Sequence, residues 1–184
     1  WDQVLCNALR HEYKADVALS AGVRWGTTTL KGDWITMEDV MTQCAMTYGE
    51  TYVTEMTGRQ LLGVLESVAD NLFDPDPYLQ SGGDMVRVGG MDYTIDPSKA
   101  LYERISDAKL DNGHVIEPDG IYKVTGWATV DRTPEGRLMW DIVRDYILDV
   151  KGSDDILHLP KINHPKLIGV NENPGMADYP GVSV

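Results

Sequence analysis

The chain has 184 residues, of which 42% are hydrophobic and 24% are charged, a balance typical of a globular protein with its own core. Its formal net charge of -13 excludes the basic stripe that binding to nucleic acids or anionic membranes requires. No apolar run approaches the roughly 20 residues that cross a bilayer. We therefore expect one large domain or two small ones, with no nucleic-acid or membrane partner.

The first elements are a helix and a short strand that leads into a glycine loop. Apolar residues repeat on one face of residues 2–14, which predicts an amphipathic helix. Residues 15–19, Ala-Asp-Val-Ala-Leu, have the composition of a short buried strand. Glycines then permit a sharp turn, and the loop presents Arg24 and Trp25. Loops at strand ends commonly carry function, so this one is the first candidate.

Two helices in the middle of the chain begin with capping sequences. Residues 36–39, Thr-Met-Glu-Asp, resemble a capping arrangement that opens a short helix through Cys44. A strand is expected at 52–55. A second capping box, opened by Thr57, predicts a helix that runs to Phe73, where two prolines stop it.

The second half of the chain predicts strands followed by one long helix. Strands are expected at 91–95 and on both sides of the Asn-Gly pair at 112–113, which forms hairpin turns readily because it adopts positive φ. The longest strand candidate is 122–130. Thr133, followed by proline at the first helical position, predicts a helix that Gly152 ends.

Irregular alternation of helices and strands, with hairpins among them, predicts an α+β fold with a mixed β-sheet packed against helices. The main domain is expected to comprise 1–152. Residues 153–184 are rich in proline and lack periodicity, so we interpret them as an extended tail that wraps the same domain. Cys6 and Cys44 have no metal-binding spacing and either pair or remain as small buried hydrophobes.

The histidines do not form a pattern that suggests a metal site. Two-metal hydrolysis needs a converging cluster of carboxylate, imidazole and amide ligands. His11 lies on the first predicted helix, His114 in a hairpin, and His158 and His164 in the tail. We therefore predict no metal site and no cofactor in this chain, and no hydrolysis by the chain alone. Its start at Trp1 suggests a processed product or a piece of a longer polypeptide.

The ordered series of segments resembles the C-terminal domain of the 5'-nucleotidase superfamily. After the first helix and the arginine loop, the series comprises Ile-Thr-Met-Glu-Asp-Val, Glu-Met-Thr-Gly-Arg-Gln-Leu, Val-Gly-Gly-Met-Asp-Tyr and Tyr-Lys-Val-Thr-Gly-Trp. The Thr-Gly-x-Gln-Leu helix start alone would be weak evidence. The order of all these segments along the chain is the stronger signal, and it implies the fold of that domain.

Within that superfamily the chain looks like the SoxB-type thiosulfohydrolases. The segments that carry this resemblance are 18–26, 35–42, 46–58, 82–92 and 165–179, and Gly-Gly-Asp-Met-Val-Arg-Val-Gly-Gly is the most specific. In this family, a separate N-terminal metallophosphatase-like domain holds two metal ions, generally manganese. The resemblance implies a periplasmic enzyme that releases sulfate from a cysteine S-thiosulfonate on the carrier protein SoxYZ, with this domain forming part of the substrate channel.

Arg24 is the principal candidate for substrate binding. By resemblance it matches the arginine that faces the substrate anion in nucleotidases. Its rigid fork of donors suits the three oxygens of a sulfonate. The alternative is that Arg24 pairs with a local carboxylate while Trp25 fills the core.

Four side chains are candidates for a channel wall that admits a narrow carrier arm: Trp25, Met46, Tyr48 and Trp127. Large apolar side chains more often pack in a core than line a channel. Core packing is therefore the open alternative for Met46 and Trp127.

The glycine-rich block supplies two further candidates. Asp84 and Arg87 either pair near the channel mouth or form a surface salt bridge of little consequence. The glycine pairs at 82–83 and 89–90 indicate tight turns or close backbone approach. Glu50 is a candidate acceptor for backbone donors of a peptide arm.

The chain departs from the nucleotidase pattern where nucleotidases stack the base between two aromatic side chains. Neither 46–50 nor 127–131 has the expected motif, and each stacked face contributes about 1–3 kcal/mol. Nucleotide binding is therefore disfavoured, although Tyr48 or Trp127 can still stack a base. The alternatives are a substrate-binding domain of a nucleotidase or cyclic phosphodiesterase, and a stand-alone peptide-binding module.

Overall fold

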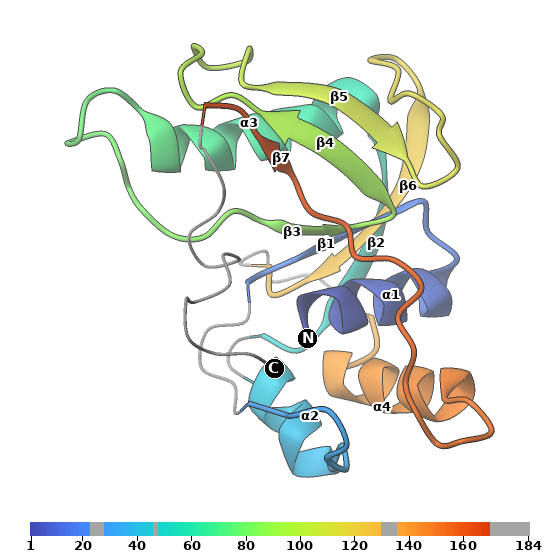
Figure 1. Cartoon of the computed structure of the whole chain (residues 1–184). Coiled ribbons are helices and arrows are strands. Elements are labelled where there is room, and N and C mark those ends of the chain that lie inside the picture. The colour runs from blue at the N-terminus through green and yellow to red at the C-terminus, as the bar shows by residue number, and fades with distance from the viewer. Residues whose placement is uncertain (23–27, 46–47, 130–135, 170–184) are drawn as a thin grey trace.

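The computed structural model describes residues 1–22, 28–45, 48–129 and 136–169 (Figure 1). The helices are α1 (Asp2–Tyr13), α2 (Met37–Cys44), α3 (Gly58–Phe73) and α4 (Met139–Val150). The strands are β1 (Val17–Ser20), β2 (Thr51–Thr57), β3 (Arg87–Gly89), β4 (Met91–Ile95), β5 (Ile105–Leu110), β6 (Ile121–Trp127) and β7 (Lys166–Leu167). Within these ranges, every helix is too short or too polar to cross a bilayer.

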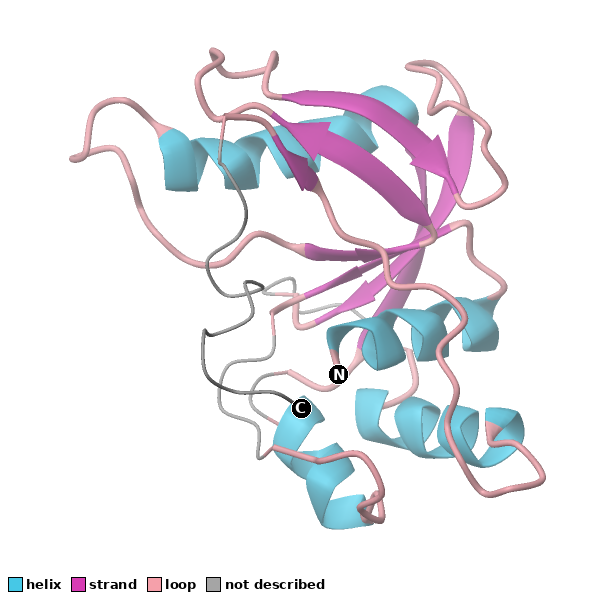
Figure 2. Cartoon of the chain, viewed as in Figure 1, coloured by secondary structure: helices cyan, strands magenta, loops and turns pink. Residues whose placement is uncertain are grey.

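Two mixed sheets form the body of the fold (Figure 2). The larger sheet has the order β2-β6-β1-β3, in which β1 is parallel to β6 and antiparallel to β3. The smaller has the order β5-β4-β7, with β7 parallel to β4. Helices pack against this framework, and the predicted α+β class is confirmed.

The larger sheet separates two hydrophobic cores. Ala18 faces the core formed with α1, α2 and α4, whereas its neighbours Val17 and Leu19 face the core formed with α3 and the smaller sheet. On β6, Trp127 faces the core with α1, α2 and α4, and Val124 faces the core with α3 and the smaller sheet. Successive strand residues point to opposite faces, so apolar side chains on both faces of the inner strands reach a core. The buried polar residues of these strands, Ser20 and Thr125, form hydrogen bonds instead.

Both cysteines lie in the core between α1, α2 and α4, and both thiols are free. Burial raises the pKa of Cys6 and of Cys44 to about 12. These thiols are therefore neutral at physiological pH and act as small hydrophobes, the second of the two roles expected for them.

Both predicted capping boxes are present. The Thr36 hydroxyl accepts from the backbone of Asp39 at the start of α2, and Thr57 accepts from Gln60 at the start of α3. In each box the third helical side chain also accepts from the cap backbone, so two donors without helical partners are satisfied. The predicted end of α3 at Phe73 is confirmed as well.

The last helix begins later than predicted. The expected start at Thr133 lies outside the described residues, but 136–138 are not helical, and α4 begins at Met139. Residues 136–138 instead form an antiparallel ribbon with 49–51, through backbone hydrogen bonds of 2.7–3.2 Å. The prediction was wrong because this pairing joins segments far apart in the sequence, and no local signal reports it.

Two predicted strands are shorter than expected. β6 ends at Trp127 because Ala128 has a left-handed backbone (φ 59°). The predicted strand, which ran to Val130, was therefore wrong at Ala128 and Thr129. Val130 itself lies outside the described residues. The hairpin turn after β5 forms with Gly113 at φ 88°. Its second arm is a single bridge between Lys109 and Val115 rather than a strand.

The second glycine pair lies where α1 crosses the chain between β3 and β4. A Cβ on Gly89 would lie 2.5 Å from the Cβ of Cys6, and one on Gly90 would lie 2.2 Å from the carbonyl oxygen of Asp16. Gly90 also has φ 89°. The expected close approach is confirmed, and it lets the chain pass directly from the larger sheet into the smaller one.

A buried carboxylate on α3 holds the loop that leads into β5. Glu66 is 4% exposed and accepts from the backbone N–H groups of Tyr102 (3.0 Å) and Ile105 (2.7 Å). The nearby Arg104, 2% exposed, forms an ion pair with Asp70. A buried acceptor that serves two backbone donors is costly to remove, because both donors lose their partner.

Glu66→Gln is expected to lower the free energy of unfolding by about 1–3 kcal/mol, because an amide NH2 would then face a backbone donor. Urea titration followed by circular dichroism measures the change. Glu103→Gln, in the same loop but exposed, is the control and should change stability by less than about 0.5 kcal/mol. Equal losses in the two variants would contradict the role assigned to Glu66.

Residues 160–168, called the strap below, run along α1 and end in β7 (Figure 1). Lys161 donates to Asp92 (2.6 Å) and Asp111 (2.7 Å). Asn163 donates to the same two carboxylates and accepts from the N–H of Gly90 across 3.0 Å. The two side chains attach the strap to the junction between the sheets.

Burial acts to raise the pKa of Asp111, but hydrogen bonds from Lys161 and Asn163, together with the nearby Arg10, outweigh it and lower that pKa. A lowered folded-state pKa stabilises the fold above the unfolded value of about 3.9, and this contribution is lost as pH falls through the folded value.

We therefore expect Asp111→Asn to destabilise the protein at pH 7 and to make progressively less difference below about pH 4. Urea unfolding of both proteins from pH 7 to pH 3 checks this. A stability difference that does not change with pH would show that the charge of Asp111 does not hold the strap.

Candidate functional site

Four strands of the larger sheet meet in one row of residues. Ser20, the last residue of β1, is paired with Arg87, the first of β3. Trp127, the last residue of β6, is paired with Thr51, the first of β2. The parallel register of Leu19 with Gly126 places Ser20 and Trp127 side by side. We call this row the site end of the sheet.

The chain segments that enter and leave the site end carry all of the predicted site residues. Arg87 and Trp127 belong to the row itself. Tyr48 and Glu50 precede β2, and Asp84 precedes β3. The topology thus brings these side chains to one end of the sheet, although they are distant in sequence.

Arg24, Trp25 and Met46 lie outside the described residues. In sequence, the first two follow β1 and the third precedes β2, so each belongs to a segment that connects to the site end. Their roles remain predictions.

Arg87 and Asp84 both contact the backbone that leaves β1. A Cβ on Gly22 would lie 3.1 Å from an Nη atom of Arg87 and 3.1 Å from a carboxylate oxygen of Asp84. The Nε of Arg87 forms an ion pair with Asp2 at 3.0 Å, and an Nη donates to the carbonyl of Met85 at 2.6 Å. The two side chains therefore lie against Gly22, and the guanidinium also ties α1 to β3 through Asp2.

Tandem glycines before β3 shape the same corner. Gly82 and Gly83 have φ values of 77° and 98°, and a Cβ on either would meet nothing within 4 Å. Their backbone conformation, rather than crowding, thus explains why glycine is needed. Neither a turn nor a close backbone approach is present at this pair, so the expectation for 82–83 was wrong although both residues have positive φ.

Trp127 lies in the core, with 6% of its surface exposed. Its indole Nε1 donates to the hydroxyl of Ser20 across 2.8 Å. This placement agrees with the packing alternative considered for Trp127, and it leaves the indole faces inside the protein.

Tyr48 and Glu50 are exposed on the segment that enters β2, and Tyr48 is 62% exposed. Gly49, between them, lies against Trp140 of α4, whose ring carbon would be 2.4 Å from a Cβ at this position. Alternate residues of an extended segment point to opposite sides. The contact of Gly49 with the indole therefore directs Tyr48 and Glu50 together away from Trp140.

Sequence reasoning missed three residues that shape the site end. Asp2 pairs with Arg87, 85 residues away, and Trp140 packs on Gly49, 91 residues away. No local sequence pattern indicates such pairs. Ser20 gave a usable signal, because a polar residue ends the otherwise apolar segment Val-Ala-Leu-Ser. A buried hydroxyl at a strand end requires a hydrogen-bond partner.

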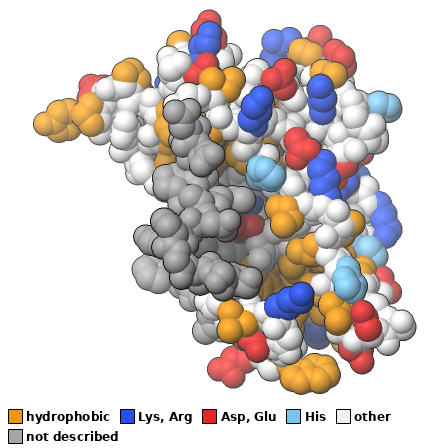
Figure 3. All heavy atoms as spheres, in the orientation of Figure 1, with side chains coloured by type: hydrophobic (Ala, Val, Ile, Leu, Met, Phe, Trp, Pro, Cys, Tyr) orange, Lys and Arg blue, Asp and Glu red, His pale blue; other side chains and the backbone are white. Residues whose placement is uncertain are grey.

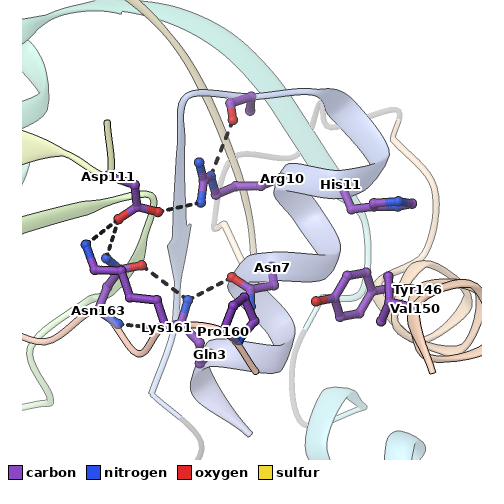
Figure 4. A pocket seen from close by; sticks show the side chains of 11 residues that line it. Gln3, Asn7, Arg10, His11, Asp111, Tyr146, Val150, Pro160, Lys161 and Asn163 are labelled. Carbon is purple, nitrogen blue, oxygen red and sulfur yellow. Dashed lines mark hydrogen bonds and ion pairs between the residues drawn. The ribbon is translucent and has the colours of Figure 1, made fainter. Parts of the chain in front are cut away.

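A hollow of about 360 Å³ lies elsewhere, between α1, α4 and the strap (Figure 4). Four polar side chains on its border are joined by hydrogen bonds: Asp111 accepts from Arg10, Lys161 and Asn163. None of the described candidate residues lines it. Because its charged groups already have partners, we interpret this hollow as part of the attachment of the strap.

The described part of the site end carries polar groups on Tyr48, Glu50 and Arg87. Among the described residues there is no group of three or more His, Cys, Asp and Glu side chains that could hold a metal ion. On the face shown in Figure 3, acidic and basic side chains are interspersed. An exposed phenol, a carboxylate and a partly exposed guanidinium can bind and orient a polar ligand.

Comparison with known proteins identifies relatives of the whole fold. The profile of the 5'-nucleotidase C-terminal domain family matches residues 2–135. Among solved structures, the sulfate thiohydrolase SoxB of Thermus thermophilus, in complex with glycerol, is 31% identical over 93% of this chain, with a TM-score of 0.79. A 5'-nucleotidase precursor, also from Thermus thermophilus, is 14% identical over 92% of the chain, with a TM-score of 0.69.

This chain spans only about a third of those structures, 32% of SoxB and 35% of the nucleotidase precursor. No curated protein sequence matches it. The similarity to the nucleotidase precursor concerns the fold alone.

Gly49→Ala is expected to destabilise the protein by about 1–3 kcal/mol, because the added methyl group overlaps the ring of Trp140. Gly63→Ala is the matched control: a Cβ there meets nothing within 4 Å, and alanine in this helix should stabilise by about 1 kcal/mol. Thermal or urea unfolding measures both. If the two substitutions shift stability in the same direction, the close packing of Gly49 on Trp140 is refuted.

Proposed function

The chain belongs to the 5'-nucleotidase C-terminal domain family, and on that premise we propose that it is the substrate-binding domain of a two-domain, metal-dependent hydrolase of the SoxB type. The observation that carries this proposal is the 31% identity with SoxB over 93% of the chain. Because the chain spans a third of that structure, the remaining machinery would belong to a preceding domain.

The proposed division of labour follows from the residues of the site end. A preceding metallophosphatase-like domain would hold two metal ions, which we expect to be manganese, and these would supply the nucleophilic water. This chain would supply Arg24 as the anion-binding group and would contribute part of the channel through Tyr48, Glu50 and Trp25. Asp84 and Arg87 would set the course of the backbone that leads to Arg24.

The proposed substrate is a cysteine S-thiosulfonate on the carrier protein SoxYZ in the periplasm. In the reaction, water attacks the terminal sulfur and the bond between that sulfur and its sulfur neighbour breaks. The carrier retains a persulfide, while sulfate and a proton are released. Two donors of Arg24 can bind two sulfonate oxygens and hold the group in line with the attacking water, which contributes positioning and charge stabilisation.

A nucleotide substrate is the second candidate, because the fold is shared with nucleotidases. The buried position of Trp127 argues against it, since an indole in the core cannot stack on a base. Tyr48 alone would then provide the aromatic contact. Titration with AMP separates the candidates: tight binding that Tyr48→Ala abolishes would favour the nucleotidase function.

Arg24→Ala in the complete enzyme is expected to lower kcat/KM for sulfate release by about 100-fold, because a charge-assisted donor pair is lost. The assay follows sulfate released from a peptide that carries a cysteine S-thiosulfonate.

Arg59→Ala is the control for that experiment. This arginine lies at the opposite end of the sheet, is 73% exposed and pairs only weakly with Asp119, so activity should remain at the wild-type level. Wild-type activity in Arg24→Ala itself would overturn the assignment of Arg24.

A further inference from the structure

Four large apolar side chains are exposed just before α2 and at its first residue. The exposed fractions are 66% for Leu30, 82% for Trp34, 37% for Ile35 and 41% for Met37. None of the four belongs to either hydrophobic core of the described residues, and we call them the α2 surface. Single exposed hydrophobic residues are common, but a group of large ones marks a surface that binds a partner.

Local hydrogen bonds hold this segment in a defined shape. The backbone N–H of Leu30 donates to the Asp33 carboxylate across 2.8 Å, and the N–H of Asp33 donates to the carbonyl of Leu30 across 3.1 Å. The capping box of Thr36 and Asp39 then begins α2. Residues 34–35 lie between these two bonded units, so little backbone freedom is lost when they bind a partner.

The core of the protein already uses a different part of α2. Val40 (3% exposed) and Cys44 (0%) face the core shared with α1 and α4. Figure 1 places α2 at the lower end of the molecule, and Figure 3 shows hydrophobic side chains at that end. One apolar face is sufficient to hold an amphipathic helix on the fold. The α2 surface is therefore additional to what folding of this chain requires.

The N-terminus lies close to this helix. Trp1 packs against the core to which Val40 and Cys44 belong, and Figure 1 shows the N-terminus between α1 and α2. Under the proposed function, a preceding domain joins the chain here and makes up most of the protein, because the chain spans 32% of SoxB. A domain tethered beside α2 has a high effective concentration there, so a small apolar contact is enough to hold it.

We propose that the α2 surface is the interface on which the preceding domain of the same polypeptide packs, with an apolar patch of that domain facing Trp34. This inference rests on the proposed function, which supplies that domain. A permanent neighbour suits an apolar surface, since lasting interfaces are more hydrophobic than those that form and separate. A second copy of this chain would bring a further charge of -13 to the contact, and the two copies would repel.

The first test places the photoreactive residue p-benzoylphenylalanine at position 34 of the complete enzyme. Illumination should link this position to the preceding domain within one polypeptide, so the product keeps the mass of a monomer and peptide mapping locates the link. The matched control carries the same residue at position 121. Ile121 begins β6, at the end of the larger sheet opposite the site end, and is 61% exposed. The control should give no link.

Three results would overturn the inference. A product of doubled mass would assign the α2 surface to a second copy of the chain. A link that forms only when the carrier protein is added would assign it to that partner. No link, or a link only within residues 1–184, would show that the preceding domain does not cover Trp34. Because none of these results depends on sulfate release, the role proposed for Arg24 and this inference can fail independently.

The second test weakens the contact. Leu30→Ser combined with Trp34→Ser should speed limited proteolysis between the two domains by about 10-fold, because loss of a buried aromatic anchor typically weakens an interface by that factor or more. Both variants should stay folded by circular dichroism, since the changed side chains are exposed in this chain. Ile121→Ser, matched to Leu30 in exposure, should leave the rate unchanged. Equal rates in the two variants would contradict the docking role.

Discussion

The parallel pairing of β1 with β6 is the constraint on which the arrangement of the site depends. Parallel neighbours end at the same edge of a sheet, so Ser20 and Trp127 finish their strands side by side. The antiparallel partners β3 and β2 begin at the same edge, with Arg87 and Thr51. Four connections between elements therefore open on one end of the sheet, and side chains from distant parts of the sequence meet there.

Close packing on both faces keeps this arrangement fixed. Core side chains from α1, α2 and α4 cover one face of the larger sheet, and those from α3 and the smaller sheet cover the other. The approach is so close that only glycine fits at several positions, among them Gly89 under α1 and Gly49 under Trp140. Each contact restricts the backbone near the site end but contributes no functional group. The residues that hold the site in place are therefore different from those that could contact a ligand.

Local physical chemistry made much of the fold predictable. The capping boxes at Thr36 and Thr57 satisfy backbone donors within a few residues, so their helices begin where the sequence indicates. The start of α4 could not be predicted in this way. Thr133, followed by proline, is a favourable helix start just before residues 136–138. The backbone groups of 136–138 nevertheless pair with 49–51, and this long-range pairing outweighs the local helix preference.

The sequence by itself determined the α+β class, the helix caps, the glycine turns and the family to which the chain belongs, because each depends on residues that are near one another or on an ordered series of motifs. Only the tertiary structure decided which residues share the site end, that Trp127 lies in the core, and that Asp2 pairs with Arg87. The physical reason is that strand register and close packing act between residues far apart in the chain, and no short stretch of sequence records them.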